Sequence, residues 1–148
     1  MTCGEILLHA TCIRWSGAAM LLRGGSGAGK SDLALRMLDQ GATLVADDQV
    51  LVSAADGKLF ARPPEALAGL LEVRGIGIIR VRHEAPARIG LVVDLVEEGG
   101  MERMPEPAGA ALLGCVLPRF SLVARHASAA AKLRLAVRQA SGLVTPIE

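Results

Sequence analysis

The sequence predicts a single α/β domain with a partly parallel sheet. Short apolar runs that fit strands alternate with segments that fit helices, and a glycine cluster joins one predicted strand to the first predicted amphipathic helix. The chain has 148 residues, about the size of one domain, and 51% of them are hydrophobic. That is enough to form a core and too apolar for a disordered chain, so we expect one domain over residues 1–148.

Strands are expected where a short apolar run is bounded by glycine or by turn-forming residues. Such runs lie at 6–8, 11–13, 18–23, 43–46, 58–61 and 88–96. The first two each fit a short strand or one arm of a hairpin, and residues 49–53 are expected to continue the fourth. Asp56 and Gly57 form a turn signal that predicts a hairpin leading into the fifth run.

Three segments are expected to be helical. Apolar residues recur at helical spacing over 31–40, and Gly41 stands where a C-terminal cap is expected. Two prolines precede a short predicted helix over 65–71, and Ser128 is a suitable N-cap for a helix over 129–139. The intervening stretch 97–109, which has two prolines and three glycines, is expected to be a flexible loop.

Composition argues against several classes of protein. The net charge is +1 with no basic block, which disfavours a nucleic-acid or anionic-membrane binder. No apolar stretch approaches the roughly 20 residues of a membrane span, and the first residues lack the pattern of a signal peptide, so we expect a cytoplasmic protein. The three cysteines form no CxxC pair, which disfavours a disulfide framework and a structural zinc site.

A glycine-rich segment carries the strongest functional signal. It fits the pattern G-x-x-x-x-G-K-[ST] in full and comprises Gly24, Gly25, Ser26, Gly27, Ala28, Gly29, Lys30 and Ser31. Its glycines let backbone N–H groups converge on phosphate oxygens, and the following helix adds a favourable dipole. Lys30 would neutralise the β- and γ-phosphates, and the Ser31 hydroxyl would bind Mg²⁺. We therefore expect a nucleotide or phosphate site at this P-loop (residues 24–31).

An acidic pair follows the second clear strand. Asp47 and Asp48 come directly after the strand at 43–46, and Asp48 is 18 positions after Lys30. Ligands of parallel α/β sheets bind at the carboxyl ends of the strands, so the pair should lie near the P-loop. Side chains alternate along a strand, so the two carboxylates should point in different directions. The pattern does not show which one faces a phosphate, and a pair of solvated turn residues is the alternative.

Other candidates are weaker on residue type alone. A lone histidine such as His9 is usually a surface or core residue. Glu72 could be a second Mg²⁺ ligand and Arg74 a phosphate clamp, but a surface ion pair explains them almost as well. Further candidate clamps for phosphate charge are Arg103, Arg119 and Arg125.

Taken together, these segments resemble the catalytic domain of the bacterial HPr kinase/phosphorylase family. The matching residues are His9, the P-loop, the segment 41–48 (GATLVADD) and the glycine-rich segment 71–79 (LEVRGIGII), and the likeness extends over essentially the whole chain. The resemblance implies an α/β, P-loop-containing core similar to phosphoenolpyruvate carboxykinase, with a mixed sheet. It also implies hexameric assembly.

The resemblance further implies an ATP-dependent protein-serine kinase that acts on HPr, a phosphocarrier of the phosphotransferase system. By position, Lys30 matches the phosphate-binding lysine, and Ser31 and Glu72 match the Mg²⁺ ligands. Asp48 matches the residue that is the base in phosphorylation and the acid in dephosphorylation. His9 matches an active-site histidine that orients the acidic pair through Asp47, and Arg103 aligns less closely with a catalytic arginine.

Three departures from the family pattern bear on activity. Because His9 comes almost at once, we expect a short form without the family's usual amino-terminal domain, and the usual His-Gly is here His9 and Ala10. The late Pro-Gly-Arg turn that the family links to dephosphorylation is replaced in 123–128 (VARHAS). We therefore expect kinase activity first and leave phosphorylase activity open.

Three alternative functions remain. A P-loop kinase of a small molecule would share the same loop and would be indifferent to HPr. A GTPase switch would need an Asn-Lys-x-Asp motif, and the chain contains no asparagine. A nucleotide sensor that has lost phosphoryl transfer is disfavoured because Lys30, Ser31, Asp48 and Glu72 are all present.

Overall fold

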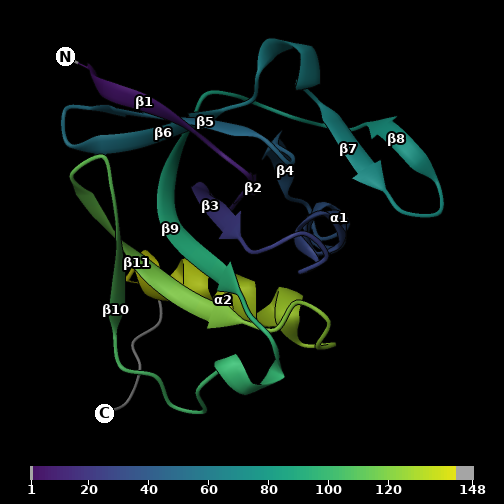
Figure 1. Ribbon diagram of the computed structural model, residues 1–148. Coiled ribbons are helices and arrows are strands. Elements are labelled where there is room, and N and C mark those ends of the chain that lie inside the picture. The colour runs from purple at the N-terminus through teal and green to yellow at the C-terminus, as the bar shows by residue number, and fades with distance from the viewer. Residues whose placement is uncertain (1, 143–148) are drawn as a thin grey trace.

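The computed structural model describes residues 2–142 as a curled, mixed β-sheet with two α-helices against one face (Figure 1). In chain order the elements are β1 (Thr2–Leu8), β2 (Ala10–Trp15), β3 (Ala18–Arg23), α1 (Lys30–Leu38), β4 (Thr43–Ala46), β5 (Val50–Ala55), β6 (Lys58–Arg62), a 3₁₀ turn (Glu65–Leu67), β7 (Leu70–Val73), β8 (Gly77–Arg80), β9 (Ala87–Leu95), a second 3₁₀ turn (Glu98–Gly100), β10 (Ala108–Leu112), β11 (Cys115–Leu122) and α2 (Ala129–Ala140).

The sheet is built around β9, which pairs in parallel with β3 on one side and with β11 on the other. Beyond β3 the strands continue through β2 to β4, and β10 forms a hairpin with β11. The first residues of β9 also pair with β6, which leads to β5 and β1. The sheet therefore curls over itself, and the expected partly parallel sheet is confirmed.

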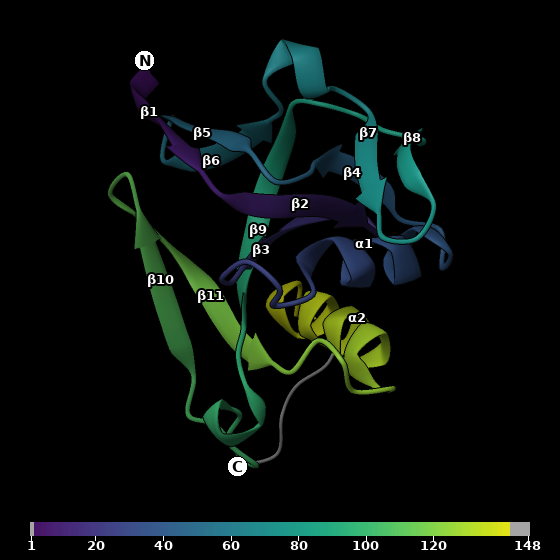
Figure 2. The ribbon, with the colours of Figure 1, turned by 45° about the vertical axis from the view of Figure 1, so that its right-hand side comes forward.

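Two apolar clusters fill the two faces of the central sheet. Met20 and Leu22 of β3 face α1 and α2, whereas Ala19 and Leu21 face the curled strands β1, β5 and β6. β3 is buried on both faces, which explains its continuous apolar run. Figure 2 shows α1 and α2 together on one side of β2 and β3. The P-loop follows the end of β3 and leads into α1.

Most expected elements are confirmed. β3 and β4 have the predicted bounds, and β5 and β6 form the predicted hairpin around Asp56 and Gly57. After α1, the N–H of Gly41 donates to Leu38 and that of Ala42 donates to Met37, and Gly41 has φ +95°. This is a glycine-terminated helix end of the Schellman type, as predicted.

Some expectations are wrong in instructive ways. The predicted helix over 65–71 is only a 3₁₀ turn followed by β7, because Gly69 has φ +76° and Leu71 is fully buried in the core beneath α1. Seven residues are also too few for a helix that lacks strong packing. The expected continuation of β4 over 49–53 is wrong. Residues 50–53 lie in β5, which pairs with β1 and β6, and Gln49 lies between β4 and β5.

Two further expectations are corrected near the C-terminus of the described chain. The predicted flexible loop over 97–109 contains a 3₁₀ turn and the start of β10. Ser128 stands at the N-cap of α2, but its side chain forms no capping hydrogen bond. Among residues 2–142, none of the helices has the length and apolar character that crossing a membrane requires.

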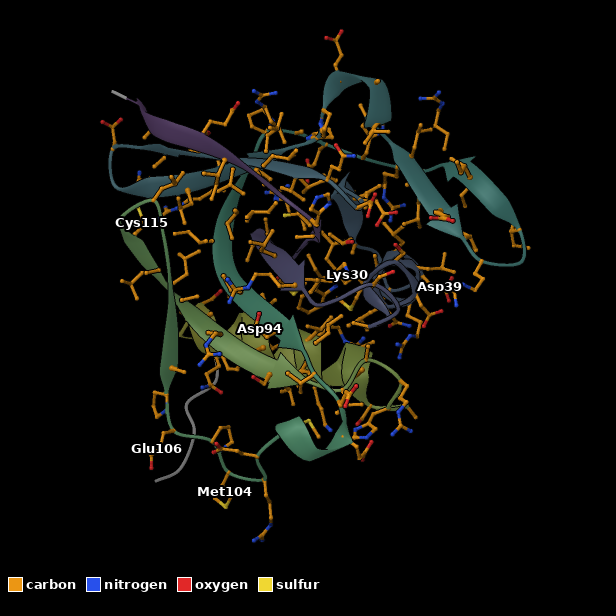
Figure 3. All side chains as sticks on the ribbon, in the orientation of Figure 1. Lys30, Asp39, Asp94, Met104, Glu106 and Cys115 are labelled. Atoms are coloured by element: carbon orange, nitrogen blue, oxygen red, sulfur yellow. The ribbon has the colours of Figure 1, made fainter. Side chains whose placement is uncertain are left out.

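An ion pair fixes the strands where the P-loop begins. Arg23, the last residue of β3, donates from Nε to Asp94 Oδ1 at 2.7 Å and from an Nη to Oδ2 at 3.1 Å, and Arg119 adds a contact at 3.3 Å. Figure 3 labels Asp94 on β9. Partial burial opposes ionisation of Asp94, but the two arginines outweigh it and hold its pKa below the usual value.

We expect Asp94→Asn to destabilise the protein at neutral pH. The difference in stability from the wild type should disappear in acid. Because the pKa of Asp94 is lowered by folding, its ionisation stabilises the folded state above the ordinary value of 3.8. That contribution disappears as the pH falls through the lowered pKa. The melting temperatures of both proteins, measured from pH 7 down into acid, should draw closer together once the pH falls below the ordinary value of 3.8. A constant difference over this range would contradict the assignment.

Candidate active site

The P-loop joins β3 to α1 in a conformation that depends on glycine. Gly27 and Gly29 have φ +82° and +96°, which L side chains rarely adopt. The N–H of Ala28 donates to the Gly25 carbonyl at 3.0 Å, and the N–H of Leu33 to the Gly29 carbonyl at 2.9 Å. α1 begins at Lys30, so the strand, loop and helix that the motif requires are all present.

The Lys30 side chain lies back over the loop. Its Nζ donates to the carbonyls of Gly24 at 2.7 Å and Gly25 at 3.1 Å. Figure 3 shows Lys30 where the loop meets α1. Both acceptors are neutral, and within residues 2–142 no carboxylate forms an ion pair with this ammonium group. The loop thus presents one ammonium group and a helix N-terminus at the same place, which is suited to a polyphosphate.

Asp47 is buried and faces the P-loop. Its Oδ1 accepts from the Ser31 hydroxyl at 2.7 Å and from the Thr11 hydroxyl at 2.9 Å, and its Oδ2 accepts from the backbone N–H of Glu72 at 3.3 Å. The predicted proximity of the acidic pair to the P-loop is confirmed. A P-loop serine paired with an aspartate from a neighbouring strand is the arrangement that holds Mg²⁺ in nucleotide-binding proteins.

A β-bulge in β4 aims Asp47 at α1. Cys12 pairs with Ala46, but Ile13 pairs with Leu44, so Val45 is an extra residue in β4. Leu44 packs on the helix side of the sheet, whereas Val45 and Ala46 both pack on the opposite side. The next residue, Asp47, is thereby returned to the helix side, where Ser31 lies. Regular alternation would have pointed it away from α1.

Asp48 is exposed and sits at the centre of a tight turn. Its φ is +66°, and the N–H of Gln49 donates to the Asp47 carbonyl at 2.7 Å, which describes a γ-turn. Aspartate tolerates this left-handed backbone better than most residues. Among the described residues, the Asp48 side chain has no hydrogen bond or ion pair. The expected divergence of the two carboxylates is confirmed, because one is buried in the network and the other is open to solvent.

The oxygen donors present fit Mg²⁺ but do not enclose it. In residues 2–142 no group of three or more His, Cys, Asp or Glu side chains is arranged around one point. Mg²⁺ commonly uses one or two protein oxygens and completes its shell with phosphate oxygens and water. Ser31 and Asp47 meet that need. Glu72 lies next to them through its backbone, while its side chain is exposed, and its role as a ligand stays a prediction.

The other sequence candidates are not joined to this network. His9 is exposed and forms no hydrogen bond with Asp47 among the described residues, so its orienting role stays a prediction. Arg103 is exposed in the loop next to Met104, which Figure 3 shows far from Lys30. Arg74 is exposed at the tip of the β7–β8 hairpin.

Two of the candidate arginines are neutralised by carboxylates. Arg119 contacts Asp94, as described above, and Arg125 donates to Glu98 at 2.7 Å. His126 Nε2 also lies 2.8 Å from Glu98 Oε1, and its hydrogen bond holds the pKa of Glu98 below the usual value. Glu98 therefore ties the segment after β9 to the segment before α2.

A hollow of about 520 Å³ lies on the other flank of the P-loop from Asp47. Its lining comes from the P-loop, from α1 and from the segments after β9 and β11: Gly27, Ala28, Gly29, Asp32, Arg36, Val96, Glu97, Glu98, Gly99, Val123, Ala124 and Arg125. This volume is within the range of small-molecule sites. A second hollow, of about 610 Å³, runs along α1 beside Val81 and Arg82 and contains none of the site residues.

Sequence reasoning missed Thr11 and Glu98. Thr11 stands in an apolar strand pattern, where a threonine gives no functional signal. Glu98 lies in the stretch expected to be a loop, and its partners are 27 and 28 residues away. Only the pairing of β2 with β4, and of β9 with β11, brings these residues to the site.

Comparison with known proteins agrees with this geometry. A family model described as the HPr Serine kinase C-terminal domain matches residues 2–102, which are 101 of the 148 residues. The chain belongs to this family. The part that matches the HPr serine kinase C-terminal domain includes the P-loop, Asp47, Asp48 and Glu72. Arg103 and the segment around Arg125 lie beyond it.

Individual relatives cover only part of the chain. It is 46% identical over 77 residues to the HPr kinase/phosphorylase of Clostridium beijerinckii, and 47% identical over 77 residues to that of Clostridium perfringens strain SM101. Each match covers 52% of this chain but 26% and 25% of the relative. The chain therefore spans about a quarter of the length of the curated relatives it matches.

A solved structure, the HPr(Ser) kinase/phosphatase from Coxiella burnetii, has the same fold. The TM-score is 0.82 at 24% identity, and the match covers 90% of this chain and 95% of that one. The fold expected from the resemblance is thus confirmed. A curled, mixed sheet with few helices is consistent with an α/β core of the phosphoenolpyruvate-carboxykinase type.

The P-loop geometry predicts different tolerance at two of its glycines. A Cβ at Gly29 would lie 2.9 Å from the Ala124 Cβ, at a φ of +96°, whereas a Cβ at Gly25 would have nothing within 4 Å. Gly29→Ala should cost about 1–3 kcal/mol in unfolding free energy, and the control Gly25→Ala should cost little. Urea unfolding of both variants tests this. Equal stabilities would contradict the described loop.

Proposed function

We propose that the protein is an ATP-dependent protein-serine kinase that uses Mg²⁺ to phosphorylate an HPr-type phosphocarrier. The observation that carries this proposal is that the two neighbouring aspartates have different surroundings. Asp47 is committed to the P-loop serine at 2.7 Å, and Asp48 next to it is exposed and unpartnered among the described residues. The names of the relatives supply the substrate: they are HPr kinases.

The P-loop has two distinct flanks, which orient the nucleotide. The flank with Ser31 and Asp47 is the metal side and would hold the β- and γ-phosphates. The nucleoside would leave on the opposite flank, toward the hollow of about 520 Å³. Lys30 would turn from the carbonyls of Gly24 and Gly25 to the phosphate oxygens, which are stronger acceptors because they are charged.

The transfer is an in-line displacement. The serine oxygen of the substrate forms a bond to the γ-phosphorus as the bond from that phosphorus to the β–γ bridging oxygen breaks, and ADP leaves. Asp48 accepts the proton of the serine hydroxyl. Ser31 and Asp47 would hold Mg²⁺, which would offset the negative charge of the phosphate groups. Lys30 and the P-loop N–H groups stabilise the charge that develops on the transferred group.

The exposure of Asp48 favours a protein substrate. A base on an open turn can reach a serine on the surface of another protein, whereas a small metabolite usually needs an enclosing pocket. The hexamer, the catalytic role of Arg103 and the orienting role of His9 remain predictions from the family resemblance. For the reverse, phosphorylase reaction, the altered segment at 123–128 leads us to expect kinase activity to dominate.

The test is transfer to the phosphocarrier itself. The protein is incubated with labelled ATP, Mg²⁺ and an HPr-type phosphocarrier from the same organism, and mass spectrometry locates the phosphate. We expect one phosphoserine, none on a carrier with that serine replaced by alanine, and none without Mg²⁺. Phosphorylation of a metabolite with no response to the carrier would identify a small-molecule kinase instead and overturn the proposal.

A further inference from the structure

Thr11 places a hydroxyl against the carboxylate of the site. Its side chain is fully buried in β2, between Ala10 and Cys12 of the core, and its Oγ1 donates to Asp47 Oδ1 at 2.9 Å. The same oxygen accepts from Ser31 Oγ at 2.7 Å. Thr11 and Ser31 are therefore joined through one atom of Asp47.

The hydroxyl is not needed for packing at this position. Valine has nearly the same shape and a higher preference for a buried strand, and a buried hydroxyl is costly unless it is hydrogen-bonded. The Thr11 hydroxyl is bonded to a side chain of the site rather than to its own backbone. A threonine rather than a valine at position 11 is explained if its hydroxyl holds the Asp47 carboxylate in place.

Three elements hold Asp47 from different directions. Thr11 comes from β2 and Ser31 from the first turn of α1, and both donate to Oδ1, while the N–H of Glu72 in β7 donates to Oδ2. β4 ends at Ala46, so Asp47 lies beyond the regular pairing of the strand. The bulge turns Asp47 toward α1, and the three hydrogen bonds fix the orientation of its carboxylate.

We propose that Thr11 is a positioning residue that holds Asp47 in the orientation needed to bind the Ser31 hydroxyl and Mg²⁺. The inference rests on the proposed function for the identity of the metal. Loss of the Thr11 hydroxyl would free one side of the carboxylate to rotate away from Ser31. Partners that orient a metal-binding group commonly change metal affinity by about 10- to 100-fold.

The test compares the affinity of the full chain for Mn²⁺, measured by electron paramagnetic resonance with a non-hydrolysable ATP analogue bound. Thr11→Val should weaken Mn²⁺ binding about 10-fold, and Thr11→Ser, which keeps the hydroxyl, should bind Mn²⁺ like the wild type. The melting temperature need not follow this order, because Ser lacks the methyl group and Val keeps it. Wild-type Mn²⁺ affinity in Thr11→Val would overturn the proposal.

A second pair of variants tests the proposal even if the valine variant misfolds. Thr11→Ala and Thr11→Ser both lose the methyl group and differ only in the hydroxyl. The alanine variant should bind Mn²⁺ about 10-fold more weakly than the serine variant, and equal affinities would overturn the proposal. Because the readout is metal binding and not transfer, a failure to phosphorylate the phosphocarrier would refute the proposed function without deciding the role of Thr11.

Discussion

Asp48→Asn is expected to lower the rate of phosphoryl transfer by about 10²- to 10⁴-fold while leaving ATP affinity nearly unchanged. A serine hydroxyl is a poor nucleophile at neutral pH and needs a positioned base. Asparagine has the same shape as aspartate and also tolerates the left-handed backbone of the γ-turn, so the turn at φ +66° should persist. Transfer rates at saturating ATP and calorimetric titration of ATP test the two halves of this prediction.

The matched control is Asp39→Asn. Asp39 is an exposed aspartate that directly follows α1, at the opposite end of the helix from the P-loop, and its replacement should change neither quantity. If Asp48→Asn lost transfer and ATP binding to the same extent, Asp48 would be holding the structure or the metal. It would then not be the base.

Lys30→Ala is expected to weaken ATP binding by about 10- to 100-fold and to reduce the transfer rate as well. A hydrogen bond to a charged partner contributes about 1.5–3 kcal/mol, which corresponds to that range of affinity. In the part of the chain that the structure describes, the hydrogen bonds of the ammonium group go to the carbonyls of Gly24 and Gly25, so its loss should leave the fold largely intact. Calorimetry with ATP and melting curves measure both effects.

The chain offers a control of the same chemistry. Lys58, an exposed lysine at the start of β6, lies in another part of the sheet, and Lys58→Ala should bind ATP like the wild type. Wild-type affinity in Lys30→Ala would remove the main support for a phosphate site in the P-loop.

Local patterns predicted the central part of the fold. The apolar run of β3, the P-loop and the helical spacing of α1 are all short-range features, and Gly41 ends the helix through hydrogen bonds within six residues. The hairpin around Asp56 and Gly57 is equally local. These features are confirmed because the residues that determine them are neighbours in the sequence.

The orientation of the acidic pair could not be predicted in the same way. Alternation along a strand shows that Asp47 and Asp48 diverge but not which of them turns inward. The bulge at Val45 decides this, and it depends on the pairing of β4 with β2, whose paired residues lie 29 to 34 positions earlier. Thr11 was missed for the same reason, since its partner Asp47 is 36 residues away.

The wrong prediction over 65–71 also has a long-range cause. Local residue preferences favour a helix there, but Leu71 is buried against the core, and β7 pairs with β8. Tertiary packing overrides a weak local preference. The same strand brings the Glu72 backbone to Asp47, so the misassigned segment belongs to the site.

A crystal structure with Mg²⁺ and a non-hydrolysable ATP analogue would test the account most directly. We expect the triphosphate within the P-loop, the metal in contact with Ser31 Oγ and beside Asp47, and the γ-phosphate on the side of Asp48. The nucleoside should extend into the hollow on the other flank. A triphosphate bound outside the P-loop would contradict the account. So would a γ-phosphate placed so that a serine hydroxyl could not lie between it and the Asp48 carboxylate.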